Sequence, residues 1–416
     1  MRDRTRSSAV RAGTVVSALL VGLVVTAGPA SAATAAPWRQ GDYGAARSSF
    51  NSNETVVGAA SVAHVAFARS RTAPPVDPAL PGCGGGVATK PVVVDHRMFV
   101  VLTGRLVAVD VTNGHTLWTV PLDTSLATLY PDLAVVGSRV ILARLDCISQ
   151  SDPSGSVTAY DVATGAQAWN QFFDPGPQSM VVWNNHVLFT GFEAGGGGDL
   201  VSLSASTGAL QWQYAPGFCD GMRGPVVVGN VVLAVGCDAA FNAQLEGHRL
   251  SDGALLWHRP GTWDLQRGDN AAAGGRNAFA VNESTGALTD LNPLTGATRW
   301  ARPGMGDALA VDGSRVYTDC GSDTLCALRL TNGSTAWSTA ELGIAGHPVA
   351  VANGLVFSGG GFDTIVRASN GTAVDDLFGE PLAIWSNPVS TIAVANGRIV
   401  VSGGRIVDVY AVPGAT

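Results

Sequence analysis

The residues with the clearest chemistry in this sequence are its six cysteines. They are Cys83, Cys147, Cys219, Cys237, Cys320 and Cys326. An even number of cysteines is typical of disulfides when a chain is exported. A structural zinc site is the alternative, but the chain has no C-x-x-C pair and no histidines at the spacing of such sites. The sequence therefore favours disulfides, and the fold must decide which cysteines pair.

Motifs of the common enzyme classes are missing from the sequence. It contains no G-x-S-x-G elbow, no H-E-x-x-H and no C-x-x-C-H haem site. Three glycine clusters, at 84–86, 195–198 and 359–361, lack the helix pattern and the lysine of a phosphate loop, since Lys90 is the only lysine. The seven histidines are scattered along the chain, and sequence alone assembles no catalytic set from them.

The elements that must position any site are short strands, and they belong to a sequence motif that is repeated along the chain. We call this motif the repeated phrase. An alternating strand runs into Thr/Asn/Asp-Gly and then, after three residues, into Trp. Copies of the phrase lie at 106–118, 157–169, 200–212, 247–257, 288–300 and 325–337, with a worn seventh at 365–374 that has Asp375 in place of Trp. Glycine accepts the positive φ of the turn, and each Trp is placed to cover a seam between repeats.

The repeats predict an all-β, eight-bladed β-propeller of four-stranded blades, with seven blades as the fallback. The turn glycines recur at about the 40–50-residue spacing of propeller blades, and two further strands precede each phrase. An eighth unit, 390–412, lacks its fourth strand. The segment 61–70 can supply that strand and close the ring, which removes two open edges. Residues 56–416 then form the propeller domain, and residues 33–55 are expected to be an exposed lead-in.

Blade positions suggest how the cysteines pair. Cys320 ends the second strand of blade six and Cys326 opens the third, so they face each other across a short loop. Cys219 and Cys237 lie in loops of one face, as do Cys83 and Cys147 one blade apart. We expect Cys320–Cys326, Cys219–Cys237 and Cys83–Cys147.

The D-x-x-T-G-x-x-x-W phrase and the segment FNSNETVVGAASVAHVAFA (50–68) resemble the pyrroloquinoline-quinone-type propeller repeat family. The resemblance covers nearly the whole chain after residue 32 and implies the fold. Members include calcium-dependent quinoprotein dehydrogenases, envelope assembly scaffolds and secreted proteins, so the fold does not fix the function. The eight-bladed alcohol dehydrogenases carry a vicinal disulfide and a Glu/Asn/Asp calcium set. No two cysteines are adjacent here, and no residue matches that set individually.

Polar residues at the start of each inner strand are the candidate ligand-binding groups. The residues expected at the starts of the eight inner strands are Lys90, Tyr130, Gln178, Arg223, Asn270, Asp307, His347 and Asn387. The repeat demands no particular side chain there, so these groups predict a polar pocket at one rim of the channel. The alternative is that they are solvated strand ends.

The N-terminus and the composition complete the sequence-based hypothesis. Residues 1–32 read as a signal peptide, with arginines, an apolar stretch and Ala30-Ser31-Ala32. Charged residues are only 14%, and the net charge of −7 argues against nucleic-acid binding. The sequence favours a secreted, monomeric binding or scaffold protein for a protein or small molecule, with no cofactor and no membrane span. The alternative is an enzyme at the channel mouth, either dependent on the quinone with calcium or cofactor-free.

Overall fold

The computed structural model describes residues 36–73, 89–102, 104–122, 128–146, 154–192, 198–216, 222–268, 276–321, 324–340, 348–358, 364–376, 389–403 and 405–414. The expected signal peptide, 1–32, lies outside these residues. No helix in the described ranges is long and apolar enough to span a membrane.

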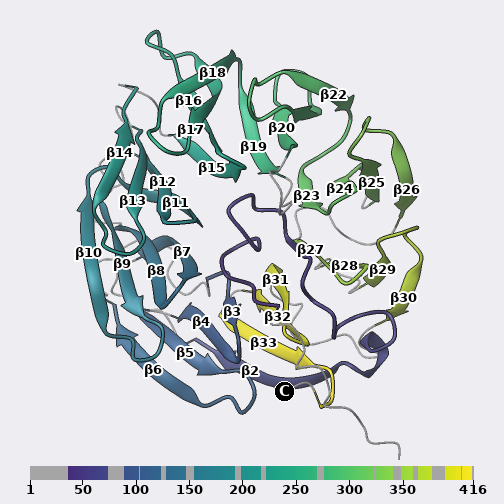
Figure 1. Cartoon of the computed structure of the whole chain (residues 1–416). Helices are drawn as coiled ribbons and strands as arrows, with labels where there is room; N and C mark the ends of the chain where they lie inside the picture. The colour runs from purple at the N-terminus through teal and green to yellow at the C-terminus, as the bar shows by residue number, and fades with distance from the viewer. Residues whose placement is uncertain are drawn as a thin grey trace, which may run out of the picture. The chain divides into compact units, whose positions relative to one another are not determined.

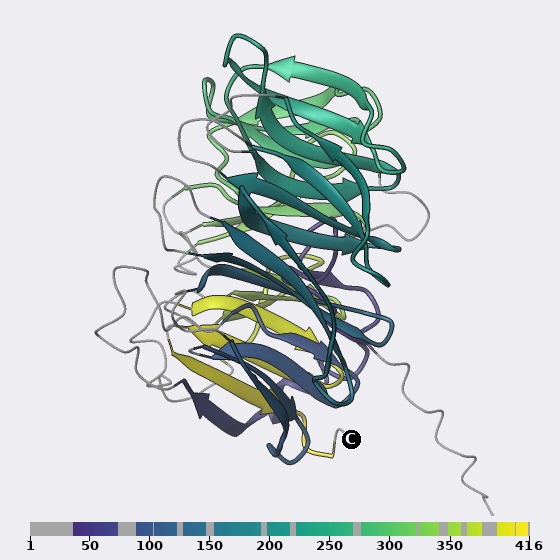
Figure 2. The ribbon, with the colours of Figure 1, turned by 90° about the vertical axis from the view of Figure 1, so that its left-hand side faces the viewer.

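The described strands form eight sheets arranged in a ring, which confirms the eight-bladed propeller (Figure 1). Figure 2 shows the ring from its edge. Blades one and two contain β3 (Val92–Val94), β4 (Arg97–Leu102), β5 (Arg105–Asp110), β6 (Thr116–Pro121), β7 (Thr128–Val136), β8 (Arg139–Asp146), β9 (Gly155–Asp161) and β10 (Gln167–Phe173). Blades three and four contain β11 (Gly176–Trp183), β12 (His186–Phe192), β13 (Leu200–Ser204), β14 (Leu210–Tyr214), β15 (Arg223–Val228), β16 (Val231–Cys237), β17 (Ala243–Arg249) and β18 (Leu255–Pro260).

The second half of the ring repeats this antiparallel order. Blades five and six contain β19 (Trp263–Gly268), β20 (Ala278–Asn282), β21 (Ala287–Leu291), β22 (Thr298–Pro303), β23 (Ala308–Val311), β24 (Arg315–Asp319), β25 (Leu325–Arg329) and β26 (Thr335–Thr339). Blades seven and eight contain β27 (Val349–Ala352), β28 (Leu355–Ser358), β29 (Thr364–Arg367), β30 (Ala373–Asp376), β31 (Val389–Ala395), β32 (Arg398–Gly403) and β33 (Ile406–Ala411). The first strand of each blade is its inner strand, and we call the face where inner strands end the turn face.

An N-terminal strand closes the ring, as the sequence predicts. β2 (Ala66–Thr72) pairs antiparallel with β33 and supplies the fourth strand of blade eight. The strand begins later than the predicted 61–70 segment, because residues 62–64 form the 3₁₀ turn η1 (Val62–His64). Arg69 crosses the closing seam and donates to the carbonyl of Thr112 in blade one at 2.7 Å.

Tryptophans join the six seams between blades one and seven by one repeated contact. Each indole N–H donates to a backbone oxygen of the next blade at 2.8–3.2 Å, in the pairs Trp118–Val162, Trp169–Ala205, Trp212–Leu250, Trp257–Pro293, Trp300–Leu330 and Trp337–Ala368. The ring lies on that blade's turn glycine. Gly208 has φ +75°, and a Cβ there would lie 2.7 Å from Trp169. Glycine is therefore required by the close packing as well as by the positive φ.

The expectation that residues 33–55 form an exposed lead-in is wrong for residues 36–51, whereas Ser52, Asn53 and Thr55 are exposed. Residues 36–51 lie inside the ring, where Figure 1 shows them in purple, and we call them the inner segment. Ala36, Trp38, Ser48 and Asn51 are at most 2% exposed. Residues 50–51 form β1 (Phe50–Asn51), which pairs parallel with β27. The segment was misread because it has no strand-like alternation.

The inner segment bonds the last or second-last residue of every inner strand. The amides of Val93, Val135, Val182, Val227, Gly268, Val311 and Val351 donate to its oxygens at 2.7–2.8 Å. In blade eight, the Asn51 side-chain amide donates to the carbonyl of Val394 at 2.8 Å. The channel is therefore filled by the protein's own chain at its turn-face end.

Replacement of Trp38 tests how strongly the inner segment supports the ring. Trp38 is 1% exposed and packs among blades one and eight. We expect Trp38→Ala to lower the free energy of unfolding by about 3–5 kcal/mol, because a large buried side chain leaves a cavity. Denaturant unfolding measures this change, with Phe172→Ala, a 63%-exposed ring, as the control. A loss no larger than that of the control would show that the segment does not anchor the fold.

Candidate functional site

The structure places four of the predicted rim residues where inner strands begin. Lys90 precedes β3, Gln178 lies near the start of β11, Arg223 opens β15 and Asp307 precedes β23. Asp307 accepts a hydrogen bond from Gln266 at 3.3 Å. The charges of Arg223 and Asp307 both act on Asp264 of β19, so the structure brings these groups into one neighbourhood.

The other four rim residues are not placed in this way. Tyr130 falls within β7, but its side chain lies outside the described part, as do His347 and Asn387. Asn270 also lies outside it, and its predicted position is wrong. The inner strand of blade five is β19, which ends at Gly268, so Asn270 follows that strand instead of preceding it. The sequence of this strand, WDLQRG, is polar and lacks the apolar alternation that marks the other inner strands.

Lys90 belongs to a charged cluster around Asp42 of the inner segment. The Asp42 carboxylate lies 2.6 Å from Lys90 Nζ, 3.6 Å from Arg47 Nη1 and 3.9 Å from Arg267 Nη1. Burial alone would raise the pKa of Asp42, but the charges of Lys90, Arg267 and Arg47 outweigh it and hold that pKa well below its usual value. The cluster therefore fixes an ionised carboxylate near the middle of the ring.

The two arginines of the cluster also bond the protein backbone and hydroxyls. Arg47 donates to the carbonyl of Pro225 at 3.2 Å and to the Ser179 hydroxyl at 2.5 Å. Arg267 donates to the Ser49 hydroxyl at 2.8 Å. These bonds join the inner segment to blades three, four and five, so the cluster holds the segment in place. Sequence reasoning missed Asp42, Arg47 and Arg267 because none belongs to the repeated phrase.

Backbone conformation in the inner segment is unusual. Asp42, Tyr43, Arg47 and Ser49 have φ values of 55°, 78°, 52° and 49°, in the left-handed region that side chains other than glycine rarely adopt. Such conformations persist where the surrounding structure over-determines them, and they gather at functional sites. The segment is thus a candidate part of a site as well as a structural element.

A pocket of about 600 Å³, which we call the central pocket, opens at the turn face beside the inner segment. Arg39, Tyr43 and Asn53 line it from the N-terminal chain. The ends of the inner strands and their turns complete it with Val94, Asp95, Val135, Val182, Trp183 and Asn184, among others. The pocket is therefore built jointly by the inner segment and blades one to three.

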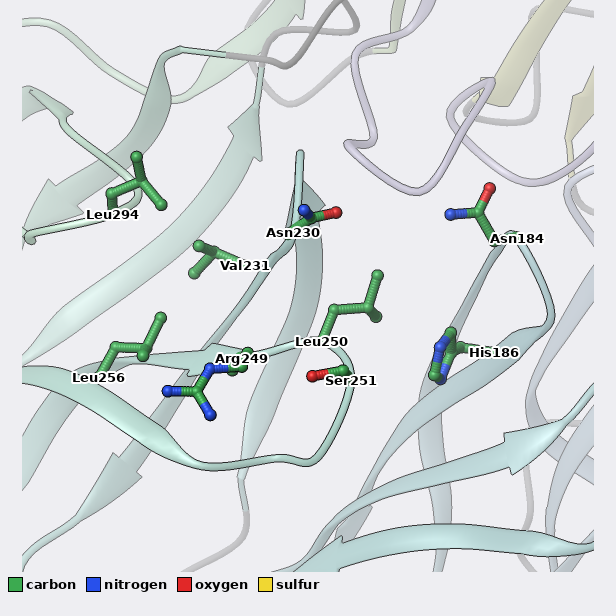
Figure 3. A pocket seen from close by; sticks show the side chains of 9 residues that line it. All are labelled: Asn184, His186, Asn230, Val231, Arg249, Leu250, Ser251, Leu256 and Leu294. Carbon is green, nitrogen blue, oxygen red and sulfur yellow. The ribbon is translucent and has the colours of Figure 1, made fainter.

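A second pocket of about 550 Å³, the blade pocket, extends from Asn184 across blade four (Figure 3). Its walls are mostly apolar, with Val231, Leu250, Leu256 and Leu294, and Arg249 lies beside them. Leu294 is 65% exposed. Asn184 lines both pockets, so the two adjoin on the turn face.

The cysteine predictions have different outcomes. Cys320 and Cys326 form a disulfide, as predicted. Cys237 is also disulfide-bonded, but its predicted partner Cys219 lies outside the described residues, and so do Cys83 and Cys147. The pairings Cys219–Cys237 and Cys83–Cys147 stay predictions.

A calcium-bound quinone would need oxygen ligands that are free to hold the ion. Within the part of the chain that the structure describes, no group of three His, Cys, Asp or Glu side chains could hold a metal ion. Asp42, a carboxylate near the middle of the ring, is already surrounded by three cations.

Comparison with known proteins places the chain among related propellers. A family model described as outer membrane protein assembly factor BamB matches residues 38–171 and 153–316.

The fold is similar to quinohemoprotein alcohol dehydrogenase from Comamonas testosteroni, with TM-score 0.64, 15% identity and 92% and 82% of the two chains covered. It is also similar to BamB from Moraxella catarrhalis, with TM-score 0.54, 15% identity and 85% and 99% covered. A europium-containing methanol dehydrogenase gives TM-score 0.58, 14% identity and 90% and 98% covered. No curated protein matches the sequence significantly. At these identities, the solved structures show a shared fold alone.

Asp42→Asn tests the charged cluster. The lowered pKa means that the ionised carboxylate stabilises the fold above the ordinary aspartate pKa of 3.8, and that this stabilisation is lost as the pH falls from there through the folded-state pKa. We expect the variant to lose about 3 kcal/mol of unfolding free energy at pH 7 because it leaves buried cations uncompensated. Its deficit relative to the wild type should shrink below pH 3.8.

Denaturant unfolding across pH measures both effects. Asp252→Asn is the matched control, because Asp252 pairs with Arg249 at an exposed position and should change stability little. A deficit for Asp42→Asn that is equal at pH 7 and at low pH would contradict the assigned role.

Proposed function

The chain belongs to the PQQ-like repeat family of the assembly factor BamB, and from this premise we propose that it is a non-catalytic binding scaffold. The observation that carries the proposal is the inner segment. Residues 36–51 bond all eight inner strands, which supports a rigid ring. Rigid scaffolds favour binding because little order has to be gained when a ligand docks.

The proposed binding surface is the turn face. The central and blade pockets adjoin there, and their volumes lie in the range of about 300–1,000 Å³ that is typical of ligand sites. Exposed Trp183 and Leu294 add apolar surface at this face. The predicted rim at the other ends of the inner strands is a second candidate surface, but Lys90 is already bonded to Asp42 there.

The proposed location is outside the cytoplasm. The disulfide Cys320–Cys326 supports an oxidising compartment, where such bonds persist. The arginine-rich and apolar N-terminal sequence supports export by a signal peptide. We further propose that the protein acts as a monomer and needs no cofactor.

The competing function is a quinone-dependent dehydrogenase. It has support from the fold that the chain shares with quinohemoprotein and methanol dehydrogenases. Against it stand the lack of adjacent cysteines in the sequence and the commitment of Asp42 to Lys90, Arg47 and Arg267. A shared fold does not transfer an activity, so the residues of the site decide.

An activity assay separates the two functions. The purified protein is incubated with pyrroloquinoline quinone and Ca²⁺ and then assayed for dye-coupled oxidation of a panel of alcohols and sugars. We expect no turnover above that of the quinone and calcium without protein. Turnover that follows protein concentration would overturn the scaffold proposal.

A further inference from the structure

The central pocket presents two aromatic rings on its wall. Trp183 ends β11 and is 36% exposed, so part of its ring is accessible from solvent. Tyr43 lies in the inner segment, where Trp38 meets it edge-on with ring centroids 5.2 Å apart. Rings held in this way offer flat apolar faces, with polar atoms only at their tips. Flat C–H surfaces, such as those of pyranose rings, pack well against them.

Polar side chains beside these rings remain available to a ligand. Arg39, Asp95 and Asn184 are exposed. Their side chains make no hydrogen bond or ion pair to any other described residue. All three groups are planar: a guanidinium presents donors side by side, a carboxylate presents two acceptors, and an amide presents an acceptor beside a donor. Neighbouring hydroxyl groups can accept from the guanidinium, donate to the carboxylate and do either with the amide.

The charge of the pocket argues for a neutral ligand. Arg39 and Asp95 contribute one charge of each sign, so the lining favours neither an anion nor a cation. Beneath them, Val94, Val135 and Val182 form a buried apolar floor. An extended peptide would find few backbone hydrogen-bond donors on the inner strands here. The amides of Val135 and Val182 already donate to oxygens of the inner segment at 2.7 and 2.8 Å.

We propose that the central pocket binds a neutral saccharide, with a sugar ring stacked on Trp183 and its hydroxyls bonded by Arg39, Asp95 and Asn184. This inference rests on the proposed binding function and names its ligand class. The inner segment supplies Arg39 and Tyr43, so the same residues that fill the channel would also form part of the sugar site.

The test is binding of defined sugars to the intact protein. A glycan array identifies candidates, and calorimetry then measures the dissociation constant for the best neutral mono- or disaccharide. We expect a dissociation constant of about 1 mM or tighter. Trp183→Ala should weaken it by about tenfold or more because the stacking surface is removed. Asp95→Asn should also weaken it, because one of the two acceptor oxygens is replaced by an NH2 donor.

Phe172→Ala is the matched control. This variant also removes an exposed aromatic ring, but Phe172 lies on the outer strand β10. Its dissociation constant should equal that of the wild type. Circular dichroism checks that Trp183→Ala keeps the fold, as expected for a partly exposed residue at the end of a strand.

Three outcomes would overturn the saccharide proposal. They are the absence of binding to any neutral glycan, equal affinity in Trp183→Ala, and binding of a peptide library in place of glycans. Each of these results can occur in a protein that shows no quinone-dependent turnover. Failure of the ligand class is therefore distinguishable from failure of the scaffold function, which the oxidation assay decides.

Discussion

Unpaired backbone groups on the inner edges of eight strands set the main constraint on this propeller. Within its own blade, each inner strand pairs with a neighbour on one side only, so its other edge faces the channel. Buried amides need partners, and an open edge invites pairing with other chains. The inner segment meets this need by passing once around the channel and bonding every blade near the end of its inner strand.

That role imposes costs on the inner segment itself. To reach strands on all sides, it adopts a left-handed backbone at Asp42, Tyr43, Arg47 and Ser49, a conformation that costs of order 1–3 kcal/mol per residue. The Asp42 cluster offsets this cost because it ties the segment to Lys90 and Arg267 on blades one and five. Strain and buried charge thus occur together, and each persists because the ring surrounds them.

The same arrangement separates structural positions from positions that are free to bind. Tryptophan–glycine contacts occupy the seams, and the inner segment occupies the channel end. The side chains of Asp95, Trp183 and Asn184, at the ends of inner strands and in the turns after them, belong to neither set of contacts and line the central pocket. This division explains how dehydrogenases and assembly factors share the fold, since their functions depend on residues added to a common frame.

Sequence alone determined the elements whose information is local. The repeated phrase encodes strands, turns and seams within about a dozen residues, and it predicted the eight blades, the closing strand and Cys320–Cys326. Only the tertiary structure decided the course of residues 36–51, the Asp42 cluster, the place of Asn270 after β19 and the central pocket. These features rest on contacts between distant parts of the chain, such as Asn51 with Val394, 343 residues apart. No periodic pattern records such contacts, because they exist only once the ring has closed.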